Sequence, residues 1–243
     1  MPTLPVDYKQ ALDRLADKLP RLLGGNLYSC IVYGSAVRGN VVRGHSDINF
    51  LIILNESTPE AHSAIADCLD GKVKVDLFII GRRGMERSFQ AFAIKFRSIA
   101  RNYRLLYGTD PFQELSISDE RLRFICEQSL RNLRLRCVHN YIFLRHKPQQ
   151  YAYYLRKTYA AVFIDISEVL RLEKVEFATD FSQRIAIIEK HFAVDASILQ
   201  RLLELKSNGE RLSKDQIPAI HGNLFNLLHH VITWVEAQWP TPQ

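Results

Sequence analysis

The pattern of apolar positions divides the first half of the chain into short helices and strands. Apolar side chains recur at helical spacing over residues 6–23, which predicts an amphipathic helix that ends at Gly24. Residues 27–33 and 48–54 form short apolar runs rich in β-branched side chains, which predict strands, and the second run is apolar on both faces. The pattern continues with a helix over 59–69, a strand over 73–80, a short helix over 85–90, an apolar segment over 92–99 and an edge strand over 104–107.

From residue 118 onward the pattern changes to long stretches with helical periodicity. The predicted helices cover residues 118–146, 149–173, 181–192, 195–206 and 213–238. No stretch rich in Pro, Gly and Ser separates the two halves of the chain. The sequence therefore predicts an α+β domain over residues 1–115, followed by an all-α helical bundle over residues 116–243.

The composition is that of an ordinary globular protein, with 47% hydrophobic and 24% charged residues. No run approaches the roughly 20 apolar residues that a membrane-spanning helix needs, and the amphipathic first segment lacks the apolar middle of a secretory signal. The four cysteines lie far apart in the sequence, so we expect buried free thiols rather than a disulfide framework or a zinc site. These features predict a cytoplasmic protein without a membrane partner.

The net charge of +6 is concentrated in one part of the chain. Residues 121–174 contain eleven Lys and Arg against four Asp and Glu, so this segment alone carries a charge of +7. Such a segment suits an anionic partner, whether a triphosphate, a nucleic acid or a phosphorylated metabolite. It is equally typical of a solvated helix face, and the sequence leaves both interpretations open.

Chemically distinctive residues follow the first predicted strand, which ends in Tyr33 and continues into Gly34, Ser35 and Arg38. A Gly-Ser turn lets backbone N–H groups approach phosphate oxygens without a Cβ in the way, and the Ser hydroxyl adds a donor. The guanidinium of Arg38 is a planar fork that binds the same kind of oxygen. These residues are candidates for binding a triphosphate.

Candidate metal ligands stand at the start of the second strand, where Ser46 precedes Asp47 and Asn49 follows two residues later. Because residues i and i+2 of a strand point to the same face, Asp47 and Asn49 should project together beside the Gly-Ser turn. Asp76 interrupts the apolar third strand, where burial would be costly unless the carboxylate bound a metal or paired with Arg38. If the third strand lies beside the second, these oxygen ligands form a set that suits Mg²⁺.

The order of these motifs resembles the signature of the DNA polymerase β-like nucleotidyltransferase superfamily, in which one strand ends in Gly-Ser and the next carries Asp-hydrophobic-Asp/Glu. The resemblance covers residues 27–80, is weaker over 81–110, and is only architectural in the helical half, which is similar to the bundles of small-substrate and aminoglycoside nucleotidyltransferases. It implies a mixed sheet flanked by helices, a nucleoside triphosphate (NTP) co-substrate and Mg²⁺. It implies catalytic roles for Asp47 and Asp76, metal binding by Asp47, Asn49 and Asp76, and nucleotide binding by Gly34, Ser35, Arg38 and Asn49.

The chain departs from this signature at one position, because Asn49 stands where the superfamily has Asp or Glu. An amide oxygen can ligate a metal, but it contributes no charge. The site then has two carboxylates, Asp47 and Asp76, instead of three. We therefore expect this site to bind Mg²⁺ more weakly than a site with three carboxylates, and two carboxylates argue against a pair of bound metal ions. The fold should be unaffected.

Two further sets of residues stand out in the helical half. Arg123, Arg134 and Arg145 recur every eleven residues and so share one helix face, which faces either bound phosphates or solvent. The other set combines tyrosines with neighbouring cations, which is suited to stacking on a nucleic-acid base, although the helical spacing favours packing in the core. It consists of Tyr151, Tyr153, Tyr154, Tyr159, Arg156 and Lys157.

The leading functional hypothesis is transfer of a nucleoside monophosphate from an NTP to a hydroxyl of a small molecule or protein. In the related aminoglycoside enzymes the general base comes from the helical domain, which makes Glu127 and Glu168 candidates here. The alternative is a catalytically degenerate module that binds or senses a nucleotide. A nucleic-acid-associated protein that uses the +7 segment is less favoured, and the acceptor and the oligomeric state are left open.

Overall fold

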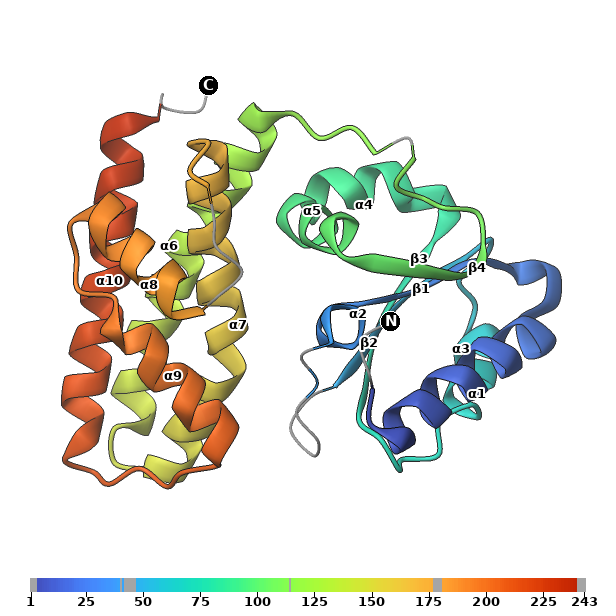
Figure 1. Cartoon of the computed structure of the whole chain (residues 1–243), viewed down its shortest axis with the longest axis horizontal. Helices are drawn as coiled ribbons and strands as arrows, with labels where there is room; N and C mark the ends of the chain where they lie inside the picture. Colours follow the sequence, from blue (N-terminus) through green and yellow to red (C-terminus); the bar gives the residue numbers. More distant parts are fainter. Residues whose placement is uncertain (1–3, 40, 42–46, 114, 177–180, 240–243) are drawn as a thin grey trace. The chain divides into compact units, whose positions relative to one another are not determined.

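The computed structural model describes residues 4–39, 41, 47–113, 115–176 and 181–239. The chain divides into two compact units, Met1–Ile117 and Ser118–Gln243. The unit boundary lies next to the domain boundary predicted after residue 115. The first unit combines a mixed sheet with helices, and the second is entirely helical (Figure 1), so the α+β fold class predicted from the sequence is confirmed.

The sheet of the first unit has four strands in the order β3-β2-β1-β4. Strand β1 is antiparallel to both β2 and β4, whereas β2 and β3 run parallel. The bounds are Leu27–Tyr33 for β1, Ile48–Leu54 for β2, Val75–Gly81 for β3 and Tyr103–Gly108 for β4. The strand predictions are confirmed, including the edge position of the last strand.

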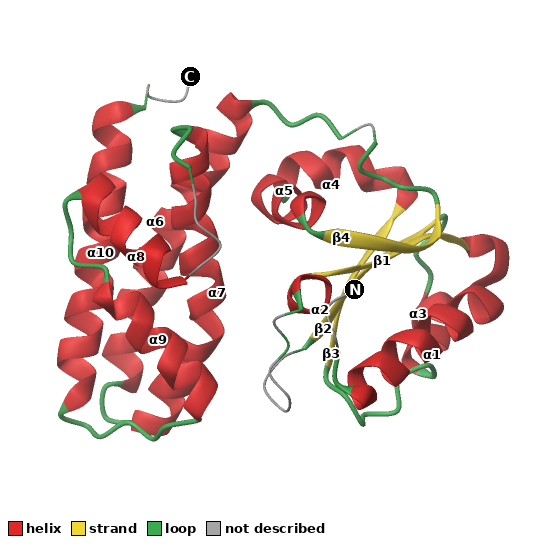
Figure 2. Ribbon diagram, viewed as in Figure 1, coloured by secondary structure: helices red, strands yellow, loops and turns green. Residues whose placement is uncertain are grey.

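Helices cover both faces of this sheet (Figure 2). Helix α1 (Val6–Leu23) and helix α3 (Pro59–Ala66) share a hydrophobic core with one face, and the side chain of Thr58 caps α3 by accepting a hydrogen bond from the Ala61 N–H. Helices α4 (Met85–Ala91) and α5 (Ala93–Arg101) lie against the other face, where the ring of Phe78 on β3 packs on the ring of Phe96 at 5.4 Å. The segment predicted only as apolar over 92–99 is thus largely helix α5.

Strand β2 is the most deeply buried element of the sheet. Its residues from Phe50 to Leu54 are 0% exposed, as expected for a strand that is apolar on both faces and covered on both. Fully burying each such side chain contributes roughly 1.5–3 kcal/mol. The position of β2 within the sheet is therefore strongly fixed, and so are the polar residues at its start.

One helical turn, α2 (Ser35–Arg38), follows β1 where the sequence predicts a glycine-rich connection. The carbonyl of Gly34 accepts hydrogen bonds from the N–H groups of Val37 and Arg38, both at 3.2 Å. Gly39 ends the turn in the left-handed conformation, with φ 78° and ψ 12°. Ser46 and the segment 42–46 before β2 lie outside the described residues.

The second unit is a bundle in which α6 runs antiparallel to α7 and α10 (Figure 1). Apolar residues of α6 from Leu122 to Cys137 are buried at helical spacing, so the helix contributes to the core of this unit. Across α6 and α10, residues early in one helix meet residues late in the other, as in the 2.7 Å ion pair between Arg131 and Glu236. The helices are α6 (Asp119–Leu144), α7 (Pro148–Leu172), α8 (Phe181–Phe192), α9 (Ser197–Asn208) and α10 (Gln216–Gln238).

The arginines of this α6 face contact groups of their own unit, and Arg145 is exposed, as the solvent alternative expected, whereas Arg123 and Arg134 are partly buried. The guanidinium of Arg123 lies 5.8 Å from the ring centroid of Trp239, and Arg134 lies 3.3 Å from the ring of His229. Arg145 lies over the ring of Tyr141 on its own helix, at 5.5 Å. These contacts make the arginines part of the bundle's surface packing, with their apolar stems covering neighbouring rings.

Two expectations from composition can be compared with the structure. All four cysteines are free and buried, as predicted. Burial raises the pKa of the Cys30 and Cys137 thiols to about 12, which keeps both protonated at neutral pH. Among the described helices, none combines the length and the apolar character needed to cross a membrane.

Helix α7 buries two carboxyl groups one turn apart. Asp165 is 4% exposed and accepts a 2.5 Å hydrogen bond from the hydroxyl of Ser129 on α6, while Glu168 is 1% exposed and lies 3.4 Å from Arg171. Burial raises the pKa of Asp165 from 3.8 to about 7; the Ser129 hydrogen bond opposes this rise and the charge of Glu168 adds to it. Asp165 is thus a group whose ionisation near neutral pH opposes folding.

This burial predicts a pH dependence of stability that Asp165→Asn removes. Because the folded-state pKa is raised, the folded chain binds the extra proton between pH 3.8 and about 7, so the free energy of unfolding falls as the pH rises through this window. The contribution of one group is at most roughly 1.4 kcal/mol per pH unit. Urea unfolding of the wild type and of Asp165→Asn from pH 4.5 to pH 8 measures this contribution. The same pH dependence of the free energy of unfolding in the two proteins would contradict the prediction.

Candidate functional site

The register of the sheet places two predicted site residues, Asn49 and Asp76, in one row with Tyr33, which precedes Gly34. Tyr33 at the end of β1 pairs with Asn49 on β2, and Asn49 pairs in turn with Asp76 on β3. Residues paired in this way across neighbouring strands have side chains on the same face of the sheet. The expectation that the third strand lies beside the second is confirmed, and Asp47 precedes Asn49 by two residues.

This row lies on the sheet face that α4 and α5 cover. The opposite face carries Ile48 and Phe50, which belong to the core formed with α1 and α3. Phe78 follows Asp76 by two residues on β3 and therefore shares its face, where its ring packs against Phe96 of α5. The polar row thus stands at the rim of an apolar layer, with Asp76 exposed to solvent.

Gly34 and Asn49 fit each other closely. Gly34 has φ +80°, a conformation that other residues rarely adopt, and a Cβ at this position would lie 3.1 Å from the side-chain nitrogen of Asn49. The same Asn49 Nδ2 donates a 3.3 Å hydrogen bond to the backbone carbonyl of Asp47. The amide at position 49 therefore contributes a donor that a carboxylate lacks.

The Asp47 carboxylate is neutralised by a lysine from the neighbouring segment. The ammonium of Lys74 lies 2.7 Å from Asp47 Oδ1, with side chains that are 65% and 28% exposed, respectively. The backbone carbonyl of Lys74 also accepts a 2.9 Å hydrogen bond from the Ile48 N–H, which fixes this residue beside the start of β2. A surface ion pair of this kind contributes little to stability, but it sets the charge that a ligand meets.

Asp76 is exposed, so the expectation that its carboxylate is buried and therefore needs a metal or Arg38 as a partner is wrong. The reason is that β3 lies at the edge of the sheet, where a residue near the strand's start reaches solvent. Burial raises the pKa of the Tyr33 phenol, and the charge of Asp76 raises it further. Asp76 therefore acts electrostatically across the row, on the residue that precedes the Gly-Ser turn.

Lys95 on α5 is a cation near this row that the sequence analysis did not single out. Its ammonium lies 3.9 Å from the centroid of the Phe78 ring. Burial lowers the pKa of Lys95, and the charge of Asp76 raises it. The sequence marks Lys95 only as a polar position in an apolar segment, so its approach to Asp76 follows from the packing of α5 on β3 and from no local signal.

The remaining predicted nucleotide-binding residues follow β1. Ser35 begins α2 and is partly buried, while Arg38 ends α2 and is exposed. The first N–H groups of a helical turn have no partner within that turn, so they are available to an anion. Gly34, Ser35, Asn49 and Asp76 are thus brought to one end of the sheet by β1, β2 and β3.

The predicted metal ligands suit one Mg²⁺ better than two. Within the described part of the chain, no group of three His, Cys, Asp or Glu side chains is placed to hold a metal ion. Two carboxylates and one amide oxygen nevertheless match the usual protein contribution to Mg²⁺, which takes one or two carboxylates and completes its shell with water and phosphate oxygens. The donor set therefore fits an ion that arrives with a triphosphate.

The two candidate general bases are both engaged inside the helical unit. Arg131 donates hydrogen bonds of 2.9 and 2.6 Å to Glu127. Glu168 is 1% exposed and lies beside Arg171, so an acceptor hydroxyl has no access to it in this conformation. Neither residue is available as a free base in the structure described.

Comparison with known proteins places the fold. No protein-family model matches the sequence, and a search of curated proteins finds no significant match. Among solved structures, the chain is similar to spectinomycin adenyltransferase AAD(9) from Enterococcus faecialis, solved with ATP and spectinomycin, with a TM-score of 0.59 and 15% sequence identity. The match covers 91% of this chain and 99% of that one. The chain therefore has a nucleotidyltransferase-type fold along nearly its whole length.

The contacts of Asn49 predict that Asn49→Asp destabilises the metal-free protein. A carboxylate oxygen would replace the donor to the Asp47 carbonyl and add a negative charge to the row, which costs roughly 1–3 kcal/mol. Mg²⁺ should restore part of this loss, because the third carboxylate strengthens the ion's binding. Thermal melting in EDTA and in millimolar Mg²⁺ measures both effects.

Asn55→Asp is a matched control for this experiment. Asn55 lies just beyond the opposite end of β2, and its side chain donates a 2.7 Å hydrogen bond to the Gly25 carbonyl. Its replacement should also lower the melting temperature, but without a response to Mg²⁺. A metal-free Asn49→Asp variant that melts like the wild type would contradict the role given to the Asn49 amide.

Proposed function

We propose that this chain is a nucleotidyltransferase that moves a nucleoside monophosphate from an NTP to a hydroxyl of a small-molecule acceptor. The observation that carries the proposal is the row in which Asn49 pairs with Asp76, directly beside Gly34 and the start of α2. The fold shared with an adenyltransferase solved with a nucleotide and an acceptor supports the same conclusion.

In the proposed reaction the acceptor hydroxyl loses its proton to water and its oxygen attacks the α-phosphorus. The bond from that phosphorus to the bridging oxygen breaks, and pyrophosphate leaves with the bonding electrons. Gly34 and Ser35 hold the phosphates through the turn's N–H groups and the hydroxyl, with Arg38 assisting. Asp47, Asn49 and Asp76 would hold a Mg²⁺ ion, which supplies charge neutralisation at the phosphates. The protein's contribution is mainly positioning and electrostatic stabilisation.

Lys95 completes the proposed site. Its ammonium is on the same sheet face as Asp76 and lies over the Phe78 ring, although the residue as a whole is exposed. A cation in this position stabilises negative charge that develops on the leaving phosphates. This charge would replace part of what a second metal ion supplies at a site with three carboxylates.

A nucleotide-binding or sensing module is the second candidate, favoured by two specific contacts. The Asn49 amide donates to the Asp47 carbonyl, and the Asp47 carboxylate is paired with Lys74. Both contacts satisfy the site without a metal. Such a module would bind an NTP with an affinity that is insensitive to Mg²⁺ and to Asp47→Ala.

Pyrophosphate release tests the leading proposal, with ATP, GTP, CTP and UTP each offered together with pools of hydroxyl-bearing acceptors. Release with one nucleotide, lost in Asp76→Asn and retained in Asp13→Asn, is the expected result; Asp13 is exposed on α1, away from the row. If no combination releases pyrophosphate and Asn49→Asp restores none, the catalytic proposal fails.

Lys95→Met is expected to lower the turnover rate by roughly tenfold to a thousandfold, on the scale found when a donor that stabilises transition-state charge is removed. The methionine retains most of the side chain's packing on Phe78, so the protein should stay folded. Steady-state kinetics of pyrophosphate release measure the effect, with Lys9→Met on α1 as the control. Equal turnover in the two variants would exclude Lys95 from the site.

A further inference from the structure

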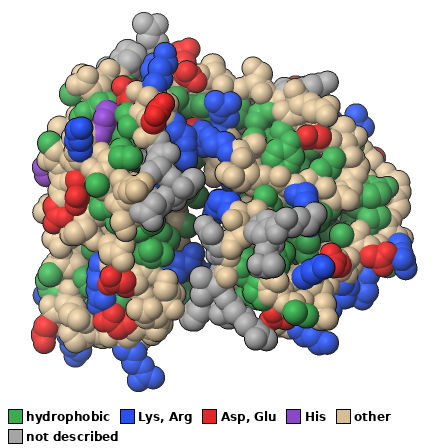
Figure 3. Space-filling model, in the orientation of Figure 1, with side chains coloured by type: hydrophobic (Ala, Val, Ile, Leu, Met, Phe, Trp, Pro, Cys, Tyr) green, Lys and Arg blue, Asp and Glu red, His purple; other side chains and the backbone are tan. Residues whose placement is uncertain are grey.

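The positive charge of segment 121–174 is mostly engaged by groups of the helical unit itself. On the face of this unit seen in Figure 3, acidic and basic side chains are interspersed. Many of the cations pair with a carboxylate or a carbonyl or lie over a ring: Arg121, Arg123, Arg131, Arg145, Arg156 and Arg171. Arg136 and Lys157 form no ion pair with any residue that the structure describes, although the ammonium of Lys157 lies 5.8 Å from the centroid of the Tyr153 ring.

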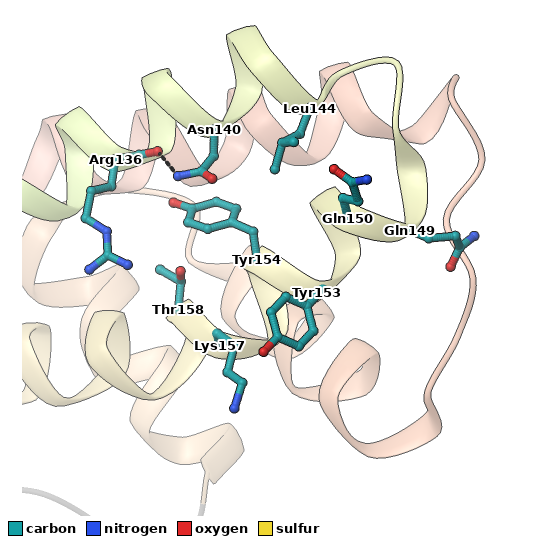
Figure 4. Close-up of a pocket in the computed structure, with 9 residues that line it drawn as sticks. All are labelled: Arg136, Asn140, Leu144, Gln149, Gln150, Tyr153, Tyr154, Lys157 and Thr158. Atoms are coloured by element: carbon teal, nitrogen blue, oxygen red, sulfur yellow. Dashed lines mark hydrogen bonds between the residues drawn. The ribbon is translucent and has the colours of Figure 1, made fainter.

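These two cations line one pocket between α6 and α7. The pocket has a volume of about 610 Å³, within the range of small-molecule sites. Figure 4 shows Arg136 and Lys157 extending to the same side, with Thr158 between them. The lining contains guanidinium, ammonium, amide and hydroxyl groups, and none of the described residues that line it is an acid. Its chemistry is that of an anion site.

The two tyrosines that line the pocket differ in exposure: Tyr154 is buried and Tyr153 is exposed. Tyr154 is 7% exposed, and burial raises the pKa of its phenol to about 12, so its hydroxyl remains a hydrogen-bond donor at neutral pH. Tyr153 is 59% exposed, although an aromatic ring of this size favours burial. Tyr151 and Tyr159 are also buried, so Tyr153 is the exposed tyrosine of the sequence cluster, and its ring lies 5.8 Å from the Lys157 ammonium.

We propose that this pocket binds a nucleoside monophosphate, either free or as the phosphorylated end of a single strand. The phosphate lies between Arg136 and Lys157, where the Thr158 hydroxyl adds a donor. The base stacks on the ring of Tyr153, and the amides of Asn140 and Gln150 meet its edge. A bare phosphate would use only the cations and leave the ring and the amides without a role.

This site lies entirely within α6 and α7, and it shares no residue with the row at Asn49 and Asp76. The proposal therefore stands apart from the proposed transfer reaction. The two fail separately: Asp76→Asn removes the transfer site and leaves this pocket unchanged, whereas changes at Arg136 and Lys157 remove the pocket alone.

Calorimetric titration of the full chain in EDTA tests the proposal with AMP, adenosine and inorganic phosphate. We expect AMP to bind at least about tenfold more tightly than adenosine or phosphate, since two charge-assisted contacts and one stacking contact each exceed or approach 1.4 kcal/mol. The double variant Arg136→Gln/Lys157→Gln should weaken AMP binding by at least about tenfold. Asp76→Asn should not weaken it.

The control is Arg145→Gln/Lys147→Gln, which removes the same charge from the same unit outside the pocket lining. Tyr153→Ala is a second variant, expected to weaken AMP but not inorganic phosphate, and it keeps the test valid if the double variant fails to fold. A 5′-phosphorylated oligonucleotide that binds more tightly than AMP identifies the strand end as the source. Equal AMP affinity in the double variant and its control, or adenosine binding as tightly as AMP, would overturn the proposal.

Discussion

Strand β2 is hydrogen-bonded on both sides, antiparallel to β1 and parallel to β3, and its central side chains are completely buried. The candidate site depends on this arrangement, because a shift of the register by one residue would turn Asn49 away from Tyr33 and Asp76 and into the α1 and α3 core. The apolar burial of Phe50 to Leu54 makes such a shift costly. The packing of Phe50 to Leu54 thus fixes the positions of Asp47 and Asn49 at the start of β2.

Asn49 contributes to structure and chemistry at once. Its Nδ2 lies close to Gly34, where a Cβ would crowd it, and donates a hydrogen bond to the Asp47 carbonyl. Asn49 thus links the turn after β1 to the start of β2. A carboxylate in the same place would face a carbonyl oxygen and would need a cation to be tolerated. The amide therefore stabilises the site without metal and reduces the charge available to bind one.

Most of the fold followed from sequence, because the signals are local. The apolar run of β2, the helical periodicity of α6 and the Gly-Ser turn each fix their own element, and the nucleotidyltransferase-type fold agrees with them. The contacts that the sequence did not reveal join distant segments. Lys95 lies over the Phe78 ring because α5 packs on β3 through Phe96, and Asp76 is exposed because β3 is an edge strand.

The charges around the row favour one metal ion over two in the proposed site. Asp47 is paired with Lys74, and the charge of Asp76 raises the pKa of Lys95, so each of the two carboxylates interacts electrostatically with a cation. A site with three carboxylates would need metal ions to relieve its own repulsion. In the proposed reaction the surplus of negative charge would arrive with the triphosphate, and the ion that accompanies the triphosphate would balance it.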